Sequence, residues 1–308
     1  MIMTKSICKS ALSPAALAAV LALLQGAPAQ ALNSKSFVSN SGSDANSCAT
    51  VATACATFLH ALDQTNAGGE ITAVNTGEYG GAFINKSIHI TNDGAGEAGD
   101  LVPSTFTGFV IAAGAGDVVS LRGIVIDGQG PGRGGINVTT ASAVHVQNCV
   151  IRNLEYQTDP WGIDFGPSGN TKLFVSDTII FNNGSAAATG GIRIRPTGSG
   201  SAVVVLDRVH LENNVLGLWA DGSVNTGTGI RVLIRDSVVR GNASHGILAT
   251  SAAGKSLALI VVERSSLVSN AGTGIRADGP RATILLNDNT ITGNGAGIGA
   301  TNSGQLIS

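Results

Sequence analysis

Apolar and polar residues alternate with a period of two along most of the chain, and the alternation recurs as a repeated unit. Each unit holds an alternating apolar stretch, an Asp-like residue, two or three apolar residues, an Asn and then a Gly-Ile pair. VSDTIIFNNG, IRDSVVRGNASHGILA and VERSSLVSNAGTGIRA are three examples. No stripe of helical period runs through these segments. The pattern predicts short β-strands joined by turns.

An Asn anchors each repeated unit and sets the repeat length. Successive anchors are separated by 30, 30, 29, 28 and 24 residues. We place the anchors at Asn153, Asn183, Asn213, Asn242, Asn270 and Asn294. A unit of this size cannot bury its apolar face alone, so the units must stack. The sequence therefore predicts a β-solenoid in which the Asn side chains form a ladder that hydrogen-bonds the backbone at a turn.

The first 31 residues have the pattern of a secretory signal peptide. Lys5 and Lys9 provide the positive start, an apolar run covers residues 11–24, and residues 29–31 form a small-x-small cleavage site. The apolar run is shorter than a membrane span requires. The chain is therefore expected to be secreted or periplasmic.

The rest of the chain, residues 32–308, shows no linker, charge run or break in composition and is predicted to be a single domain. Regular rungs are expected from about residue 118 to the end, after three less regular early turns. No later segment is long and apolar enough for a transmembrane helix. The final segment GQLIS starts a further turn, so either the chain is a truncated gene product or its last rung is left uncapped.

A short segment near the start of this domain has helical character and is predicted to cap the solenoid. The cap covers about residues 46–66, with Phe58, Leu59 and Leu62 on one side of a short helix. A repeat array needs such an atypical unit to cover its first apolar layer. His60 lies on this cap and is interpreted as a packing or surface residue, because no ligand partners are recognisable in the sequence.

Three cysteines remain after the leader. Cys48 and Cys55 are close in sequence, and in an oxidising compartment they are predicted to form a disulfide that closes a short loop. The alternative, a metal site, would need further ligands, and no His occurs at ligand spacing from either cysteine. Cys149 lies in a predicted strand and is interpreted as a small buried residue.

Composition narrows the functional classes. Apolar residues make up 43% of the chain and charged residues only 12%, with 42 glycines, which excludes a disordered polar chain. Removing the two leader lysines leaves 16 basic and 20 acidic residues, a net charge of 16 minus 20, or -4. No basic face is available for nucleic acid, so a nucleic-acid partner is not expected.

The repeats resemble the right-handed parallel β-helix of the pectate-lyase-like superfold. The cap phrase CATVATACATFLHALDQTNAGGEITAV, the repeat LFVSDTIIFNNG and the turn DRVHLENNVLGLWADG are similar to those of secreted bacterial β-helix proteins of unassigned function. The resemblance covers about residues 36–308. It implies an all-β fold, a solenoid with a short N-terminal capping helix. It implies little about activity, because this superfold includes lyases, hydrolases, epimerases and binding proteins.

Strand alternation predicts which residue after each Gly faces the core. The inward stack comprises Ile136, Ile163, Ile192, Leu218, Ile247, Ile275 and Ile298. The first outward column comprises Asn137, Asp164, Arg193, Trp219, Leu248, Arg276 and Gly299. The second outward column comprises Thr139, Gly166, Arg195, Asp221, Thr250, Asp278 and Thr301.

Five residues of these columns, Asp164, Arg193, Arg195, Trp219 and Asp221, are predicted to share one surface patch. An outward Trp219 ring suits stacking on a sugar, and the two arginines offer planar forks for a carboxylate, as on uronic-acid polymers. The neighbouring long loops would wall one side of a groove and carry Arg133, Tyr156 and Trp161. The alternative is that each Arg pairs with an Asp on the next rung as an ordinary exposed neighbour.

The patch lacks a recognisable catalytic constellation. Asp164 and Asp221 lie two rungs apart, beyond the roughly 5–9.5 Å that acid-base glycoside hydrolysis requires, although Glu155 or Asp159 could supply a closer carboxylate. The fragments SHG, RIR and DPWGID resemble pieces of polygalacturonase and epimerase motifs in the wrong order or without key residues. No dense carboxylate cluster indicates calcium. No catalytic residue, cofactor or metal is predicted.

Taken together, these features favour an exported β-helix protein that binds an extracellular or cell-envelope polysaccharide. A carbohydrate-active enzyme, such as a lyase, epimerase or hydrolase acting on an acidic polysaccharide, is the first alternative. A passive surface or adhesion scaffold is the second.

Overall fold

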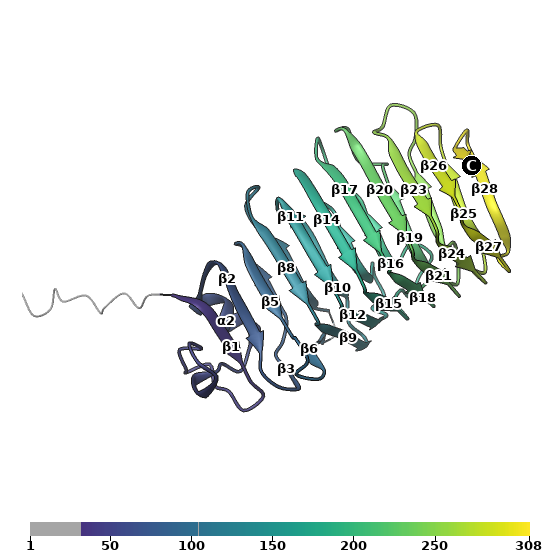
Figure 1. Cartoon of the computed structure of the whole chain (residues 1–308). Helices are drawn as coiled ribbons and strands as arrows, with labels where there is room; N and C mark the ends of the chain where they lie inside the picture. Colours follow the sequence, from purple (N-terminus) through teal and green to yellow (C-terminus); the bar gives the residue numbers. More distant parts are fainter. Residues whose placement is uncertain (1–31, 104) are drawn as a thin grey trace, which may run out of the picture. The chain divides into compact units, whose positions relative to one another are not determined.

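Parallel strands stacked into three sheets form nearly all of the computed structural model, which describes residues 32–103 and 105–308 (Figure 1). The signal peptide predicted at residues 1–31 lies outside the described residues. Within the described part, no helix is both long and apolar enough to cross a membrane.

Each sheet collects one strand from every turn of the chain. Sheet A contains β1 Asn33–Val38, β2 Thr65–Ala73, β5 Ile88–Thr91, β8 Val118–Arg122, β11 Ala143–Gln147, β14 Asn170–Ser176, β17 Ser201–Asp207, β20 Gly229–Arg235, β23 Ala258–Glu263, β26 Ala282–Asn287 and β29 Gln305–Ile307. Sheet B contains β3 Gly77–Glu78, β6 Ala98–Leu101, β9 Val125–Gly130, β12 Val150–Leu154, β15 Ile179–Phe181, β18 His210–Glu212, β21 Val238–Arg240, β24 Ser266–Val268 and β27 Thr290–Thr292. Sheet C contains β4 Ala82–Ile84, β7 Thr107–Ala112, β10 Gly134–Thr140, β13 Trp161–Phe165, β16 Gly190–Ile194, β19 Leu216–Asp221, β22 Ile247–Thr250, β25 Thr273–Asp278 and β28 Ala296–Thr301.

The chain visits the sheets in the order A, B, C in each turn, and neighbouring turns pair in parallel throughout. About nine turns result. The predicted all-β parallel solenoid is therefore confirmed. The three sheets already run through the segment before residue 118, in strands β2 to β7, where the sequence predicted less regular early turns.

The predicted inward stack forms the core of sheet C. Ile136, Ile163 and Ile192 pair in register on successive rungs, and the stack continues through Leu218 to Ile275. All of these side chains are buried. Ile298 pairs in the same column but is 53% exposed, because its strand β28 is the last of the sheet.

An Asn ladder, buried except at the partly exposed Asn294, runs along the turn between sheets B and C. Its members are Asn183, Asn214, Asn242, Asn270 and Asn294. The Oδ1 of Asn214 accepts from the backbone N–H of Asn183 at 3.0 Å, and its Nδ2 donates to the carbonyl of Ile180 at 2.9 Å. The same two kinds of bond recur along the ladder, as expected for Asn at a turn.

Two of the predicted anchors were wrong by one residue. Asn153 and Asn213 lie just before the ladder position, in left-handed conformation with φ of 57° and 53°. The ladder residue after Asn213 is Asn214, whereas Leu154 occupies that position on the earlier rung. Asn is accepted both at the left-handed position and at the inward ladder position that follows it. Two consecutive Asn residues therefore do not reveal which one faces inward.

The predicted capping helix is α2, Phe58–Gln64, preceded by the 3-10 helix η1, Val51–Thr53. Helix α2 packs against β1, β2 and β4. Phe58, Ala61 and Leu62 are buried there. Leu59 was expected on the same side but is 50% exposed, because the helix is short and the covered arc is narrow.

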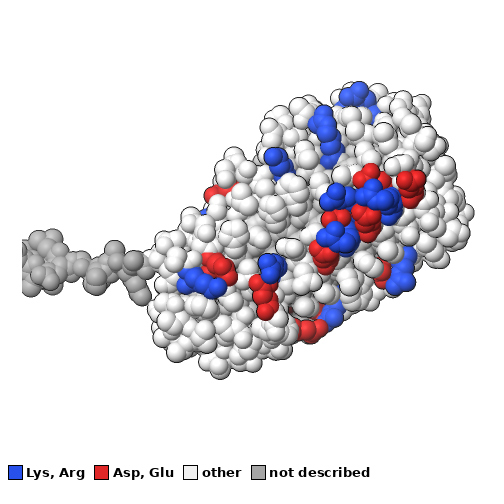
Figure 2. All heavy atoms as spheres, in the orientation of Figure 1, with Lys and Arg blue, Asp and Glu red and all other residues white. Residues whose placement is uncertain are grey.

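Charged residues of alternating sign line the corner between sheets A and B. Its members are Asp177, Arg208, Asp236, Arg264 and Asp288, and all have φ between 46° and 53°. Arg208 Nε lies 2.7 Å from Asp177 Oδ1, and Arg264 Nε lies 2.9 Å from Asp236 Oδ1. Figure 2 shows a patch where basic and acidic side chains interleave. We call the row of five residues from Asp177 to Asp288 the corner charge column.

Candidate binding groove on sheet C

The first outward column of sheet C forms the floor of the candidate site. Asn137, Asp164, Arg193 and Trp219 lie in register on successive rungs, as the alternation predicted. The same column begins two rungs earlier, with Phe83 on β4 and Val110 on β7. The floor is therefore longer than the predicted patch.

Arg193 is a buried residue that pairs with two more exposed carboxylates. Its Nε and Nη2 donate to the Asp164 carboxylate at 2.9 and 2.7 Å, and its Nη1 and Nη2 donate to Asp159 at 2.6 and 2.8 Å. Only 8% of Arg193 is exposed. Burial alone would lower the pKa of Arg193, but the two ion pairs outweigh it and hold this pKa above its usual range. Its guanidinium is occupied within the protein rather than presented to a ligand.

The two tryptophans pack beside this cluster. Trp161 is buried, donates its Nε1–H to Asp159 at 3.0 Å, and stacks under the Arg193 guanidinium at 5.2 Å. Trp219 is half-buried, with its ring centroid 6.2 Å from that of Trp161 and its Nε1–H bonded to Thr250. Trp161 is thus buried and still lines the hollow that contains Arg133 and Asp164.

The second outward column contributes one ion pair. Arg195 Nε lies 3.0 Å from Asp221 Oδ2; the Asp221 side chain is buried and the Arg195 side chain is partly exposed. This matches the alternative of ordinary cross-rung pairing, and Arg195 also lines the groove. Tyr156 is half-buried in its loop, where its carbonyl accepts from Ser185 Oγ at 2.6 Å.

Three adjoining hollows make a groove along this floor. A hollow of about 340 Å³ lies over Asp164 and Arg195, and one of about 240 Å³ lies between Arg133 and Asp164. The third, of about 530 Å³, shares Val110 with the second and reaches Phe83. From Phe83 to the rung of Arg195 the groove covers four rung steps, about 19 Å at the usual strand spacing.

The aromatic end of the groove was missed by the sequence analysis. Phe83 and Phe106 are 55% and 63% exposed, and the exposed Leu59 of α2 completes this wall. Phe83 follows the period-two pattern in the short strand β4, which is the signal that could have identified it. Exposed aromatic side chains gathered in a hollow indicate a contact surface.

A buried carboxyl, Asp100, borders the aromatic end. It lies in the inward column of sheet B, in register with Ile126. A Cβ at Gly108 would come within 2.7 Å of its Oδ2, so this glycine makes room for the carboxyl. Burial and the nearby Glu78 raise the pKa of Asp100 to about 6, against a smaller opposing hydrogen bond from the Gly81 N–H.

The carboxylates of the groove are not arranged as a free acid-base pair. Asp159 and Asp164 are the closest candidates, and the Arg193 guanidinium bridges both. Their oxygens are therefore engaged by the same cation. Loop carboxylate Glu155 is exposed, and Asp221 is held by Arg195.

A scan against protein-family models matched residues 116–307 to the family described as periplasmic copper-binding protein (NosD). The match covers well over half of the chain. The chain belongs to the NosD family. The periplasmic description confirms the predicted secreted or periplasmic location. Comparisons of the NosD-like chain with curated proteins and with solved structures found no significant match.

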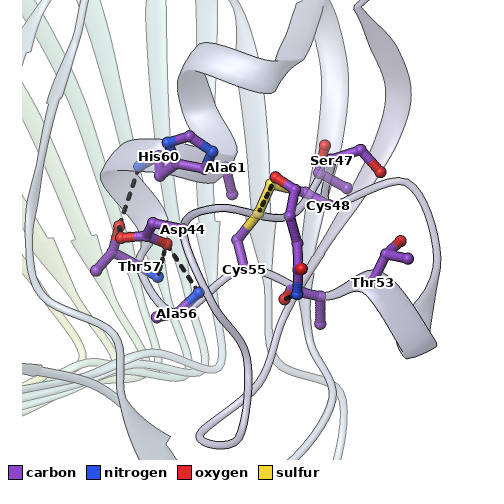
Figure 3. The surroundings of a disulfide bond; sticks show 12 residues. Asp44, Ser47, Cys48, Thr53, Cys55, Ala56, Thr57, His60 and Ala61 are labelled. Atoms are coloured by element: carbon purple, nitrogen blue, oxygen red, sulfur yellow. Dashed lines mark hydrogen bonds between the residues drawn. A yellow bond between two sulfur atoms is a disulfide. The ribbon is translucent and has the colours of Figure 1, made fainter.

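The NosD match begins just before β8, so it includes Arg133 and the Arg193 cluster and leaves out the cap and the aromatic end of the groove. Among the described residues, one group of at least three His, Cys or acidic side chains has its ligand atoms within 4.8 Å of one another. That group is Cys48, Cys55 and His60, outside the matched region. His60 thus lies close to the two cysteines, which are bonded to each other (Figure 3).

The cysteines of the cap are bonded to each other in this structure. Cys48 and Cys55 have Cα atoms 5.0 Å apart and both side chains are buried. Cys149 is a free, buried thiol. Burial raises the pKa of Cys149 to about 11, which keeps the thiol protonated and unreactive at neutral pH.

Proposed function

We propose that this protein binds an extracellular or cell-envelope polysaccharide along the groove of sheet C. The observation that carries the proposal is the row of three adjoining hollows, which has the elongated form that a polymer needs. One end offers the exposed rings of Phe83 and Phe106 for stacking on sugar faces. The other end is polar and charged.

The charges at the polar end favour an acidic polymer. Arg133 is exposed, and among the described residues no carboxylate lies within ion-pairing distance of it. Arg195 pairs with Asp221 through its Nε, has a partly exposed side chain and lines one of the hollows. The guanidinium groups of Arg133 and Arg195 are proposed to bind a sugar carboxylate, because Arg193 is already ion-paired within the protein. A binding role is favoured over hydrolysis because Arg193 bridges the nearest carboxylates.

Replacing Arg133 by alanine is expected to weaken binding of an acidic polysaccharide about tenfold, because one exposed charge-assisted contact of about 1.4 kcal/mol is lost. Phe106→Ala is expected to weaken the binding of acidic and neutral polymers alike, because stacking does not depend on sugar charge. Isothermal titration of the exported protein with a panel of acidic and neutral polysaccharides measures both effects.

The matched control is Arg231→Ala, which removes an exposed arginine from β20 on sheet A. Binding should then equal that of the wild type. Absence of any polysaccharide binding, or equal losses in Arg133→Ala and Arg231→Ala, would contradict the proposal. New chain ends in the titrated polymer would instead favour the enzyme alternative.

The description of the NosD family raises a second candidate function, copper binding in the periplasm. Within residues 116–307, no three His, Cys or acidic side chains converge as a metal-ligand group. We therefore place no copper site in the matched rungs. The observation that bears on this candidate is the proximity of His60 to Cys48 and Cys55 in the cap, where the two cysteines form a disulfide.

A further inference from the structure

The outer face of sheet A carries an unbroken column of apolar residues over its last six strands, which lie side by side (Figure 1). Its members pair in register from rung to rung. On β14 to β23 the residues before and after each member are buried, so the members point outward and are partly exposed. We call this row the apolar column: Phe174 on β14, Val205 on β17, Leu233 on β20, Val261 on β23, Leu285 on β26 and Ile307 on β29.

The strands of this face have the composition of strands that are covered on both sides. Residues 203–206 are VVVL, residues 232–234 are VLI and residues 259–262 are LIVV. Near-continuous apolar runs of this kind are typical of parallel strands buried on both faces. On sheet A, however, Val203 and Ile307 are 38% and 50% exposed. The outer face of sheet A therefore has the character of an uncovered contact surface.

Two margins of different charge flank the apolar column. The margin at the starts of the strands is basic, and among the described residues no carboxylate lies within ion-pairing distance of its cations. These cations are Lys172, Arg231, Lys255 and Arg281. The margin at the ends of the strands contains the corner charge column and, at the end of β23, Glu263. We call them the basic margin and the mixed margin.

The charges of the two margins follow the same two-rung period. Three rungs carry a cation at the start of the strand and an aspartate just beyond its end: Lys172 and Asp177 on β14, Arg231 and Asp236 on β20, and Arg281 and Asp288 on β26. The rungs between them, β17 and β23, have an arginine of the corner charge column instead, and apolar Val203 and Leu259 near the start. Lys255 lies on the loop before β23, whose last residue is Glu263.

We propose that two copies of this chain associate through the outer faces of their sheets A, in parallel, about a two-fold axis that runs along the stack. Such an axis places each rung of one copy against the same rung of the other and exchanges the two margins. The cation at the start of β14, β20 or β26 then faces the aspartate beyond the end of the same strand in the other copy. Between these pairs the two apolar columns pack at the separation of about 10 Å that is usual for stacked sheets.

Charge selects this orientation over the other face-to-face dimer. A two-fold axis along the strands would place the two basic margins against each other, and like charges across an interface oppose association. Arg235 also lies at the mixed margin, but its Nε is paired with Asp207 Oδ1 of its own chain at 3.1 Å. It therefore does not cancel the attraction between Arg231 and Asp236 of the other copy. The carboxylates of the mixed margin also make an anionic bilayer a poorer match for this face.

The size of the contact predicts a weak dimer. Six rungs at about 4.8 Å and about five residues at about 3.3 Å give a face of about 29 by 17 Å, or about 500 Å² per copy. The total of about 1,000 Å² is at the lower end for specific interfaces. The dimer should therefore form and dissociate with protein concentration. The contact uses only sheet A, so the groove on sheet C of each copy remains uncovered.

Sedimentation equilibrium of the exported protein, from about 1 to about 200 µM, tests the proposal. The average mass is expected to rise from that of one chain toward that of two. Leu233→Glu places a charge in the middle of the apolar column and is expected to weaken association about tenfold or more. The matched control is Val238→Glu, because Val238 is a partly exposed residue of β21, the next strand along the chain, on sheet B. Association of this control should equal that of the wild type.

Charge reversal tests the orientation. Arg281→Asp is expected to weaken association about fivefold, because it places a carboxylate opposite Asp288 of the other copy. Adding Asp288→Arg in the same chain restores opposite charges and should restore association, since the parallel dimer brings these two positions together. Both positions are exposed, so this pair provides the test even if Leu233→Glu fails to fold by circular dichroism.

A chain that stays monomeric at every concentration, or association that Leu233→Glu leaves unchanged, would overturn the proposal. A double variant that associates no better than Arg281→Asp alone would overturn the parallel orientation. Vesicles containing phosphatidylglycerol provide a further comparison: binding of the monomer to them that Leu233→Glu abolishes would assign this face to a membrane surface instead. The groove proposal is tested separately, because its residues lie on sheet C and in the neighbouring loops.

Discussion

Replacement of Asn214 by alanine is expected to lower the free energy of unfolding by about 3 kcal/mol. The substitution removes the acceptor of the Asn183 backbone N–H and the donor to the Ile180 carbonyl. Both groups are buried between rungs, where water cannot replace the lost partner, and each unsatisfied group costs about 1–3 kcal/mol. Urea denaturation followed by circular dichroism measures the loss.

The neighbouring residue provides the control. Asn213 is exposed and left-handed, so Asn213→Gly keeps the backbone conformation accessible and removes no ladder bond. Its effect should stay within about 0.5 kcal/mol, as at ordinary surface positions. If Asn213→Gly destabilises as much as Asn214→Ala, the ladder register described above is wrong.

The contribution of Asp100 to the free energy of unfolding is expected to fall by about 3 kcal/mol as the pH rises. In the folded protein burial and Glu78 raise the pKa of this carboxyl from 3.8 to about 6. The unfolded chain therefore loses the proton at lower pH than the folded chain does. The stabilising contribution is complete below about pH 3.8 and is lost as the pH rises through about 6.

The difference in unfolding free energy between Asp100→Asn and the wild type isolates this contribution. The variant carries no titratable group at residue 100, so the difference should grow in favour of the variant between about pH 4 and pH 7. Glu78→Gln removes one cause of the raised pKa and should give a smaller pH-dependent difference. A difference that is constant over this range would show that Asp100 ionises normally in the folded protein.

The architecture could be predicted from the sequence because the period of two defines every inward position of a regular rung. It placed Ile136 to Ile275 in one stack, and it placed Arg193 beside Asp164 and Arg195 beside Asp221. The period of two could not show that Arg193 pairs with two carboxylates within the protein. The second carboxylate, Asp159, comes from a loop whose path depends on the folded rungs.

The features missed by the sequence analysis lie in the less regular first turns. Phe83 and Asp100 belong to segments where short strands and variable loops interrupt the repeat. Their environments are set by packing between segments distant in sequence, such as α2 against β4. Local alternation contains no information about such contacts.

The corner charge column has a consequence for how an array of this kind can change its length. Its signs alternate from Asp177 through Arg208, Asp236 and Arg264 to Asp288. Deletion or duplication of a single repeat within the column would place two like charges on adjacent levels, whereas a change of two repeats restores opposite neighbours. Gene rearrangements that add or remove repeats in pairs therefore preserve this part of the surface, and those of odd number need a compensating charge reversal.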